Sequence, residues 1–136
     1  MARKPKAIVL DAWSVIAYLE DEPAGERVES LIADAHEGDI PLMMSVVNVA
    51  EIWYAFARRS SEDKANQSIL ELKQLGIEFF DADLKLALEA ARFKAQHKMS
   101  LADCFAAALA KENKADLVTG DSEFKQVEGE VKILWV

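Results

Sequence analysis

The stretch AIVLDAWSVIAYL, residues 7–19, decides the fold that we expect from this sequence. An aliphatic run from Lys6 to Leu10 is typical of a buried strand, and a helix is expected to follow from Trp13 to Leu19. Asp11 lies between the two and is the only charged residue of the stretch. Because a buried carboxylate without a partner is costly, Asp11 requires a compensating group.

Two further apolar segments each contain a single carboxylate. Glu51 is the only charged residue in 43–57, and Asp103 is the only one in 99–110. A fourth acid, Asp121, follows a strand-like run in LVTGD. If folding brings the four acids together, a bound divalent cation would compensate their charge.

The rest of the sequence alternates between short apolar runs and helical patterns. Strands are expected over residues 40–44, 77–80, 117–119 and 131–136. Helices are expected over residues 23–37, 45–59, 62–75 and 100–113, together with one that Asp83 opens and that contains Leu84, Leu88, Ala91 and Ala95, and a short helical turn near Phe124. This alternation indicates βαβ units, and therefore an α/β fold with a parallel sheet covered on both faces.

The expected topology also predicts where two of the acids meet. Right-handed crossovers place the carboxyl ends of parallel strands at one edge of the sheet, where ligands bind in open α/β folds. Asp11 and Asp121 each follow a strand, so we expect both at this edge.

Length and composition limit the class of protein. The 136 residues fit one domain, 1–136, and no apolar stretch reaches the roughly 18 uncharged residues of a membrane span. The single cysteine, Cys104, suits a reducing cytoplasm. The net charge of −8 argues against a general nucleic-acid binder, but not against an enzyme that acts on nucleic acid through bound metal ions.

Helix capping is an alternative explanation for three of the acids. Asp11 precedes a helix, Asp103 follows Ser100 by three residues as in a capping box, and Asp121 precedes a helical turn. Taken singly, each is explained at least as well by capping. Glu51 differs, because it lies in the middle of a helix among uncharged neighbours, which favours a functional role.

Together the four acids match an oxygen-rich Mg²⁺ or Mn²⁺ site, which suits hydrolysis of phosphodiesters by a metal-activated water. Other chemistries have less support. Cys104 lacks a suitable histidine partner, since His36 and His97 lie at polar helix ends, and the five glycines are scattered singly.

Three segments resemble the PIN domain, and in particular the VapC-type toxins of toxin–antitoxin pairs. They are VLDAWSVIAYLEDEP (9–23), SVVNVAEIWYAFARR (45–59) and SLADCFAAALAKENKADLVTGDSEF (100–124). The resemblance implies a sheet of strand order 3-2-1-4-5 with helices on both faces. It also implies acidic residues that bind Mg²⁺ or Mn²⁺ for endonucleolytic cleavage of RNA.

Carried onto this chain, the resemblance implies that Asp11, Glu51, Asp103 and Asp121 are the catalytic metal ligands, with Glu51 direct or through water. Thr119, the threonine of the T-G-D element, would orient a carboxylate or a water molecule.

Three further residues have open roles. Trp13 stands where many members have a small Asn or Ser, so no polar side chain helps to position the metal there. Glu123 is either an outer or second-metal contact or a solvated charge at a helix end. Asn48 either fixes the carboxylate of Glu51 or is an ordinary polar residue of the helix.

The resemblance further implies an RNA substrate, a cognate antitoxin that inserts an Arg or an amphipathic helix into the acidic groove, and a homodimer. The aromatic residues of the second segment offer apolar surface for dimerisation: Trp53, Tyr54 and Phe56. Four cations either hold the RNA backbone or are ordinary solvated charges: Arg58, Arg59, Lys94 and Lys98.

Two other functions remain as alternatives. A PIN fold that binds RNA or a partner without cleaving it is disfavoured because all four acids are present. A phosphatase-like hydrolase with Asp11 as nucleophile would usually need a second Asp two residues later, where Trp13 stands.

Overall fold

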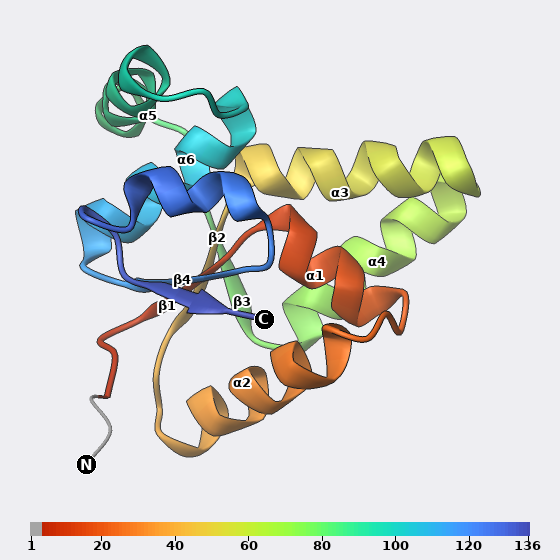
Figure 1. Cartoon of the computed structure of the whole chain (residues 1–136). Coiled ribbons are helices and arrows are strands. Elements are labelled where there is room, and N and C mark those ends of the chain that lie inside the picture. Colours follow the sequence, from red (N-terminus) through yellow and green to blue (C-terminus); the bar gives the residue numbers. More distant parts are fainter. Residues whose placement is uncertain (1–3) are drawn as a thin grey trace.

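Five parallel strands form one sheet at the centre of the protein (Figure 1). The computed structural model describes residues 4–136. The strands are β1 (Ile8–Leu10), β2 (Leu42–Ser45), β3 (Ile77–Phe80), β4 (Asp116–Thr119) and β5 (Ile133–Trp135), and their order across the sheet is β3-β2-β1-β4-β5. The parallel α/β architecture and the order 3-2-1-4-5 are thereby confirmed.

Helices cover both faces of the sheet (Figure 1). One face packs against α1 (Ala12–Leu19), α2 (Gly25–Glu37), α3 (Val46–Arg59) and α4 (Glu62–Gln74). The other packs against α5 (Leu84–Gln96), α6 (Leu101–Asn113) and the 3₁₀ helix η1 (Ser122–Val127). Each crossover between neighbouring parallel strands is thus made through at least one helix, as a parallel sheet requires.

The two cores follow from the alternation of side chains along the central strands. Ile8 and Leu10 of β1 point into the core beneath α1–α4, whereas Val9 points into the core beneath α5 and α6. Residues 104–110 of α6 are all buried, mostly alanines that allow the helix to lie close to the sheet. A helix that is apolar on every side is explained by burial of this kind.

Helix α5 turns inward a different face from the one that its first leucine suggests. Leu84 and Leu88 are 74% and 59% exposed, whereas Leu86, Ala90 and Phe93 are buried. Both sets have helical spacing, so the pattern alone does not choose between them. The face of α5 that carries Phe93 is the buried one, because the Phe93 ring fills the core against α6.

No helix within residues 4–136 is both long and apolar enough to cross a membrane. The strand register brings the carboxyl ends of β1 and β4 together, because Leu10 pairs with Val118. The residues that directly follow this pair, Asp11 and Thr119, therefore begin the candidate site.

Candidate active site

A threonine hydroxyl joins two of the acids at the carboxyl edge of the sheet. Thr119 Oγ1 donates to Asp11 Oδ2 at 2.5 Å and accepts from the backbone N–H of Asp121 at 3.1 Å. The other oxygen of Asp11 accepts from the backbone N–H of Ser14 at 2.8 Å, which caps α1. Asp11 and Thr119 are buried, at 1% and 0% exposure, so their mutual orientation is fixed by the core.

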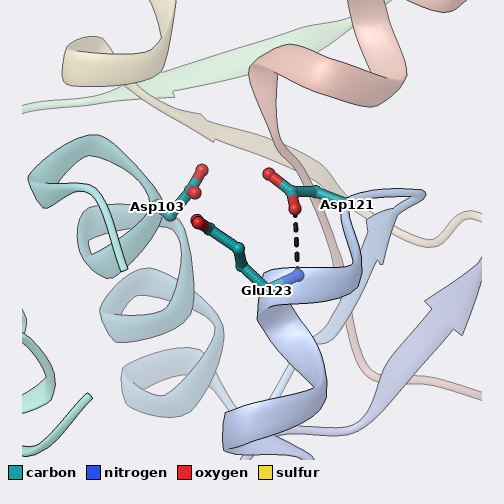
Figure 2. Close-up of side chains that lie close together, drawn as sticks. All are labelled: Asp103, Asp121 and Glu123. Carbon is teal, nitrogen blue, oxygen red and sulfur yellow. Dashed lines mark hydrogen bonds between the residues drawn. The ribbon is translucent and has the colours of Figure 1, made fainter. Parts of the chain in front are cut away.

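Three carboxylates converge beside this pair (Figure 2). Asp103, Asp121 and Glu123 each contribute an oxygen atom, and these atoms all lie within 4.8 Å of one another. Asp103 comes from the first turn of α6, which Ser100 caps by accepting from the backbone N–H of Asp103. The carboxylate of Asp121 accepts from the backbone N–H of Glu123 at 2.9 Å and so caps η1.

Glu51 is held toward the same region by a buried asparagine. Asn48 Nδ2 donates to Glu51 Oε1 at 2.9 Å and to the backbone oxygen of Ala102 at 3.2 Å. Asn48 is fully buried, and its Oδ1 has no hydrogen-bond partner among residues 4–136. It therefore ties α3 to the first turn of α6 and orients Glu51 at the same time.

Glu51 and the three converging acids line one open hollow of about 600 Å³. The lining residues are Ala12, Trp13, Ile16, Glu51, Ser100, Asp103, Asp121, Ser122 and Glu123. None of these lining residues is a lysine or an arginine. The four cations considered as RNA contacts also lie outside this lining, and Arg59 instead pairs with Glu20 at 2.8 Å.

Burial makes it difficult to ionise three of these acids, and repulsion from neighbouring charges adds to this for Asp11 and Asp103. Burial is the main reason why the pKa of Asp11 rises to about 6, with the hydrogen bonds from Thr119 and Ser14 acting in the opposite direction. Burial, together with the charges of Asp121, Asp11 and Glu51, raises the pKa of Asp103 to about 7. Burial also raises the pKa of Glu51, and the hydrogen bond from Asn48 partly offsets this.

These observations fit a hard divalent cation such as Mg²⁺ or Mn²⁺. The donors are all oxygen atoms, which such ions prefer, and they come from elements that the core holds in place. No lysine or arginine of the described lining neutralises them, and burial with the charges of neighbouring acids raises the pKa of Asp103. A bound cation would remove this repulsion.

The structure shows where each predicted site residue lies. Asp103 and Asp121 are in the converging group, Glu51 lines the same hollow, and Asp11 is buried behind it with Thr119. Capping does not exclude a place in the group, because Asp121 caps η1 and also belongs to the converging acids, whereas Asp11 caps α1 outside the lining of the hollow. Glu123, whose role the sequence leaves open, is placed by the Asp121 cap, which accepts from its backbone N–H.

We expect Asn48→Ala to lower any activity of this site by about 10- to 100-fold, as is typical when a residue behind a metal ligand is removed. The reason is that Glu51 loses the donor that orients it and α6 loses its tie to α3. Initial rates and the unfolding temperature should be measured together. Asn113→Ala is the matched control, because that amide bonds only Leu109 of its own helix; an equal loss there would contradict the positioning role.

Comparisons with known proteins agree with this architecture. The model of the PIN domain family matches residues 8–130. A search of curated proteins finds no match.

The chain is also similar to several solved structures. The DNA-bound VapBC of Salmonella typhimurium has a TM-score of 0.78 at 16% identity over 94% of this chain and 96% of that chain. The sarcin-ricin loop cleaving toxin VapC20 of Mycobacterium tuberculosis has a TM-score of 0.70 at 17% identity over 93% and 98%. FitAcB of Neisseria gonorrhoeae has a TM-score of 0.68 at 24% identity over 93% and 96%.

Proposed function

The chain belongs to the PIN domain family, and we propose that it is a metal-dependent endoribonuclease, the toxin of a type II toxin–antitoxin pair. The observation that carries this proposal is the convergence of Asp103, Asp121 and Glu123, with Glu51, in a hollow whose described lining contains no cation. Such a group of carboxylates is suited to a divalent metal ion and, through it, to hydrolysis of a phosphodiester.

The ligand set follows from the positions of the acids. Asp103 and Asp121 would bind Mg²⁺ or Mn²⁺ directly, Glu51 directly or through water, and Glu123 would complete the set from the exposed side. Asp11 would bind from the buried side, because each of its oxygens keeps a second lone pair beyond its bond to Ser14 or Thr119. Through its two hydrogen bonds, Thr119 then fixes the position of Asp11 relative to the backbone of Asp121.

The chemistry would be attack of water on the scissile phosphate. A bound divalent cation would polarise the phosphate and lower the pKa of a nearby water molecule. One carboxylate of the set would accept the proton of that water. Attack by water, rather than by the 2′-hydroxyl of the RNA, leaves no 2′,3′-cyclic phosphate.

We also propose a cognate antitoxin as the partner that silences this site. The support is structural, since the similar solved structures include VapBC-5 of Mycobacterium tuberculosis, from a family of toxin–antitoxin systems, and a toxin–antitoxin complex of Klebsiella pneumoniae. An inserted Arg or amphipathic helix would meet the cation-free hollow and satisfy its carboxylates. The carboxylates that would bind the metal ion would then also bind the antitoxin.

A homodimer remains a prediction, and only part of the proposed aromatic surface is free. Tyr54 is 46% exposed, with the guanidinium of Arg58 over its ring. Trp53 instead donates to Asn66 Oδ1 at 3.0 Å, and Phe56 packs against the core beneath α1–α4. Tyr54 is therefore the residue of this group that is best able to contact a second copy.

The proposal is tested by incubating antitoxin-free protein with a mixed pool of structured RNAs in Mn²⁺ or in EDTA. We expect cleavage in Mn²⁺ and none in EDTA. The product ends should carry no cyclic phosphate. Cleavage that is unaffected by EDTA, or that leaves cyclic phosphates, would contradict the metal-dependent mechanism. Absence of cleavage by folded protein, combined with retained RNA binding, would instead favour a PIN-fold binding module.

A further inference from the structure

Trp13 is an exposed aromatic side chain at the acidic hollow. It lies two residues after Asp11, in the first turn of α1, and it lines the hollow together with Glu51 and the converging acids. Its side chain is 41% exposed, although a large apolar ring is normally expected to be buried. An exposed aromatic ring beside a proposed phosphate-cleaving site is well placed to bind part of the substrate.

The indole ring is held in place by the backbone that carries Asp121. A Cβ atom added to Gly120 would lie only 2.1 Å from Trp13 Cη2 and 2.2 Å from Cζ3. The benzo ring therefore occupies the space that any side chain at position 120 would need. Because Gly120 separates Thr119 from Asp121, the ring and the acids are fixed by the same three-residue segment.

The other two tryptophans contrast with Trp13 in their polar contacts. Trp53 Nε1 donates to Asn66 Oδ1, and Trp135 Nε1 donates to Glu128 Oε2, at 3.0 and 3.1 Å. No hydrogen bond of the Trp13 indole is found within residues 4–136. The ring at the hollow is thus held against the backbone at Gly120, whereas its N–H group has no hydrogen-bond partner in the described part of the chain.

The charge of the hollow explains why an aromatic surface would be needed there. RNA-binding sites usually gain affinity from Lys and Arg contacts to phosphates, and the described lining of this hollow has neither. Stacking of a base on an aromatic ring is the other common source of affinity. It tolerates any sequence, because every base has a π-face, but it requires a base that is free of its own stack.

We propose that Trp13 is a base-stacking platform for an unstacked nucleotide next to the scissile phosphate. This inference rests on the proposed nuclease function and adds a substrate-binding residue to it. Trp13 binds the base while the acids act on the neighbouring phosphate, and the rigid contact with Gly120 sets the spacing between the two.

The test compares variants on a mixed-sequence 12-nucleotide single-stranded RNA and on the same sequence in a duplex, with Mn²⁺. We expect Trp13→Ala to raise KM for the single strand about 10-fold, with a smaller change in kcat, and Trp13→Phe to retain most of the affinity. Trp135→Ala is the matched control, since Trp135 is 37% exposed and lies outside the hollow. Its KM should equal that of the wild type.

Gly120→Ala supplies a second, independent variant. It should displace the ring and raise KM as Trp13→Ala does, whereas adding it to Trp13→Ala should cause no further loss. In a Trp53→Phe, Trp135→Phe background, rapid mixing with the single strand should quench the remaining indole fluorescence before cleavage.

Two results would overturn the proposal. One is an unchanged KM of Trp13→Ala while the wild type still cleaves in Mn²⁺, which would leave the nuclease function intact; weaker binding of an antitoxin by that variant would then mark Trp13 as a partner contact. The other is a wild type that neither binds nor cleaves the single strand, which would reject the nuclease function as well.

Discussion

Asp103→Asn is expected to lower the rate of RNA cleavage in Mn²⁺ by at least about 100-fold. Replacing a residue behind a metal ligand typically costs 10- to 100-fold, so the loss of a carboxylate at the centre of the converging group should cost more. Asparagine keeps the size of the side chain but removes the negative charge that would bind the cation. Initial rates on one RNA substrate, at saturating Mn²⁺, measure the effect.

The same substitution should stabilise the metal-free protein at pH 8. The wild-type carboxylate is ionised there although its pKa is raised to about 7 by burial and by neighbouring charges. Removing this charge should gain roughly 1 kcal/mol, once screening of a half-exposed group by water is allowed for. Asp63→Asn, at an exposed position in the first turn of α4, is the control: it should leave the rate unchanged, and its loss of a favourable interaction with the helix dipole should lower stability rather than raise it. A less stable Asp103→Asn variant would contradict the account of the site.

The metal-free protein is expected to lose stability as the pH rises from about 4 to about 7. Asp11 and Asp103 have pKa values of about 6 and about 7 in the folded protein, against an ordinary aspartate value of 3.8. Between these values the folded state binds more protons than the unfolded state, so the free energy of unfolding contributed by the two groups falls as the pH increases. Thermal unfolding in EDTA across this range measures the slope.

Mn²⁺ should reverse this trend. Binding requires the ionised carboxylates, so the increase in unfolding temperature should be larger at pH 8 than at pH 5. At a concentration about 100 times the Kd, the gain is about 2.7 kcal/mol, or roughly 10 °C. Asp103→Asn is the control in which the increase should be much reduced. An increase that is equal at both pH values would mean that Asp103 and Asp11 do not hold the ion.

Much of the fold could be predicted because each strand is short, apolar and followed by a helix signal. Helices α3 and α6 begin directly after the caps Ser45 and Ser100, which are the first residues of the ranges expected to be helical, 45–59 and 100–113. The position of Asp11 after β1 was also readable, because the carboxyl end of a central parallel strand faces the ligand edge. The isolation of Glu51 in an apolar helix was a sound signal that it faces the hollow.

Three features could not be predicted, since each depends on how elements pack. The buried face of α5 was ambiguous because apolar residues have helical spacing on two of its sides. The place of Glu123 depends on the turn that the Asp121 cap creates. The position of the Trp13 ring depends on its contact with Gly120, a residue more than one hundred positions away, and no pattern in either segment signals that contact.

The central claim is that the converging acids form a metal site, and calorimetric titration of Mn²⁺ into the folded, antitoxin-free protein at pH 8 tests it most directly. We predict saturable binding by the wild type, and an affinity at least about 10-fold weaker for Asp103→Asn, with Asp63→Asn unchanged. Absence of heat up to millimolar Mn²⁺, or equal binding by wild type and Asp103→Asn, would contradict the claim.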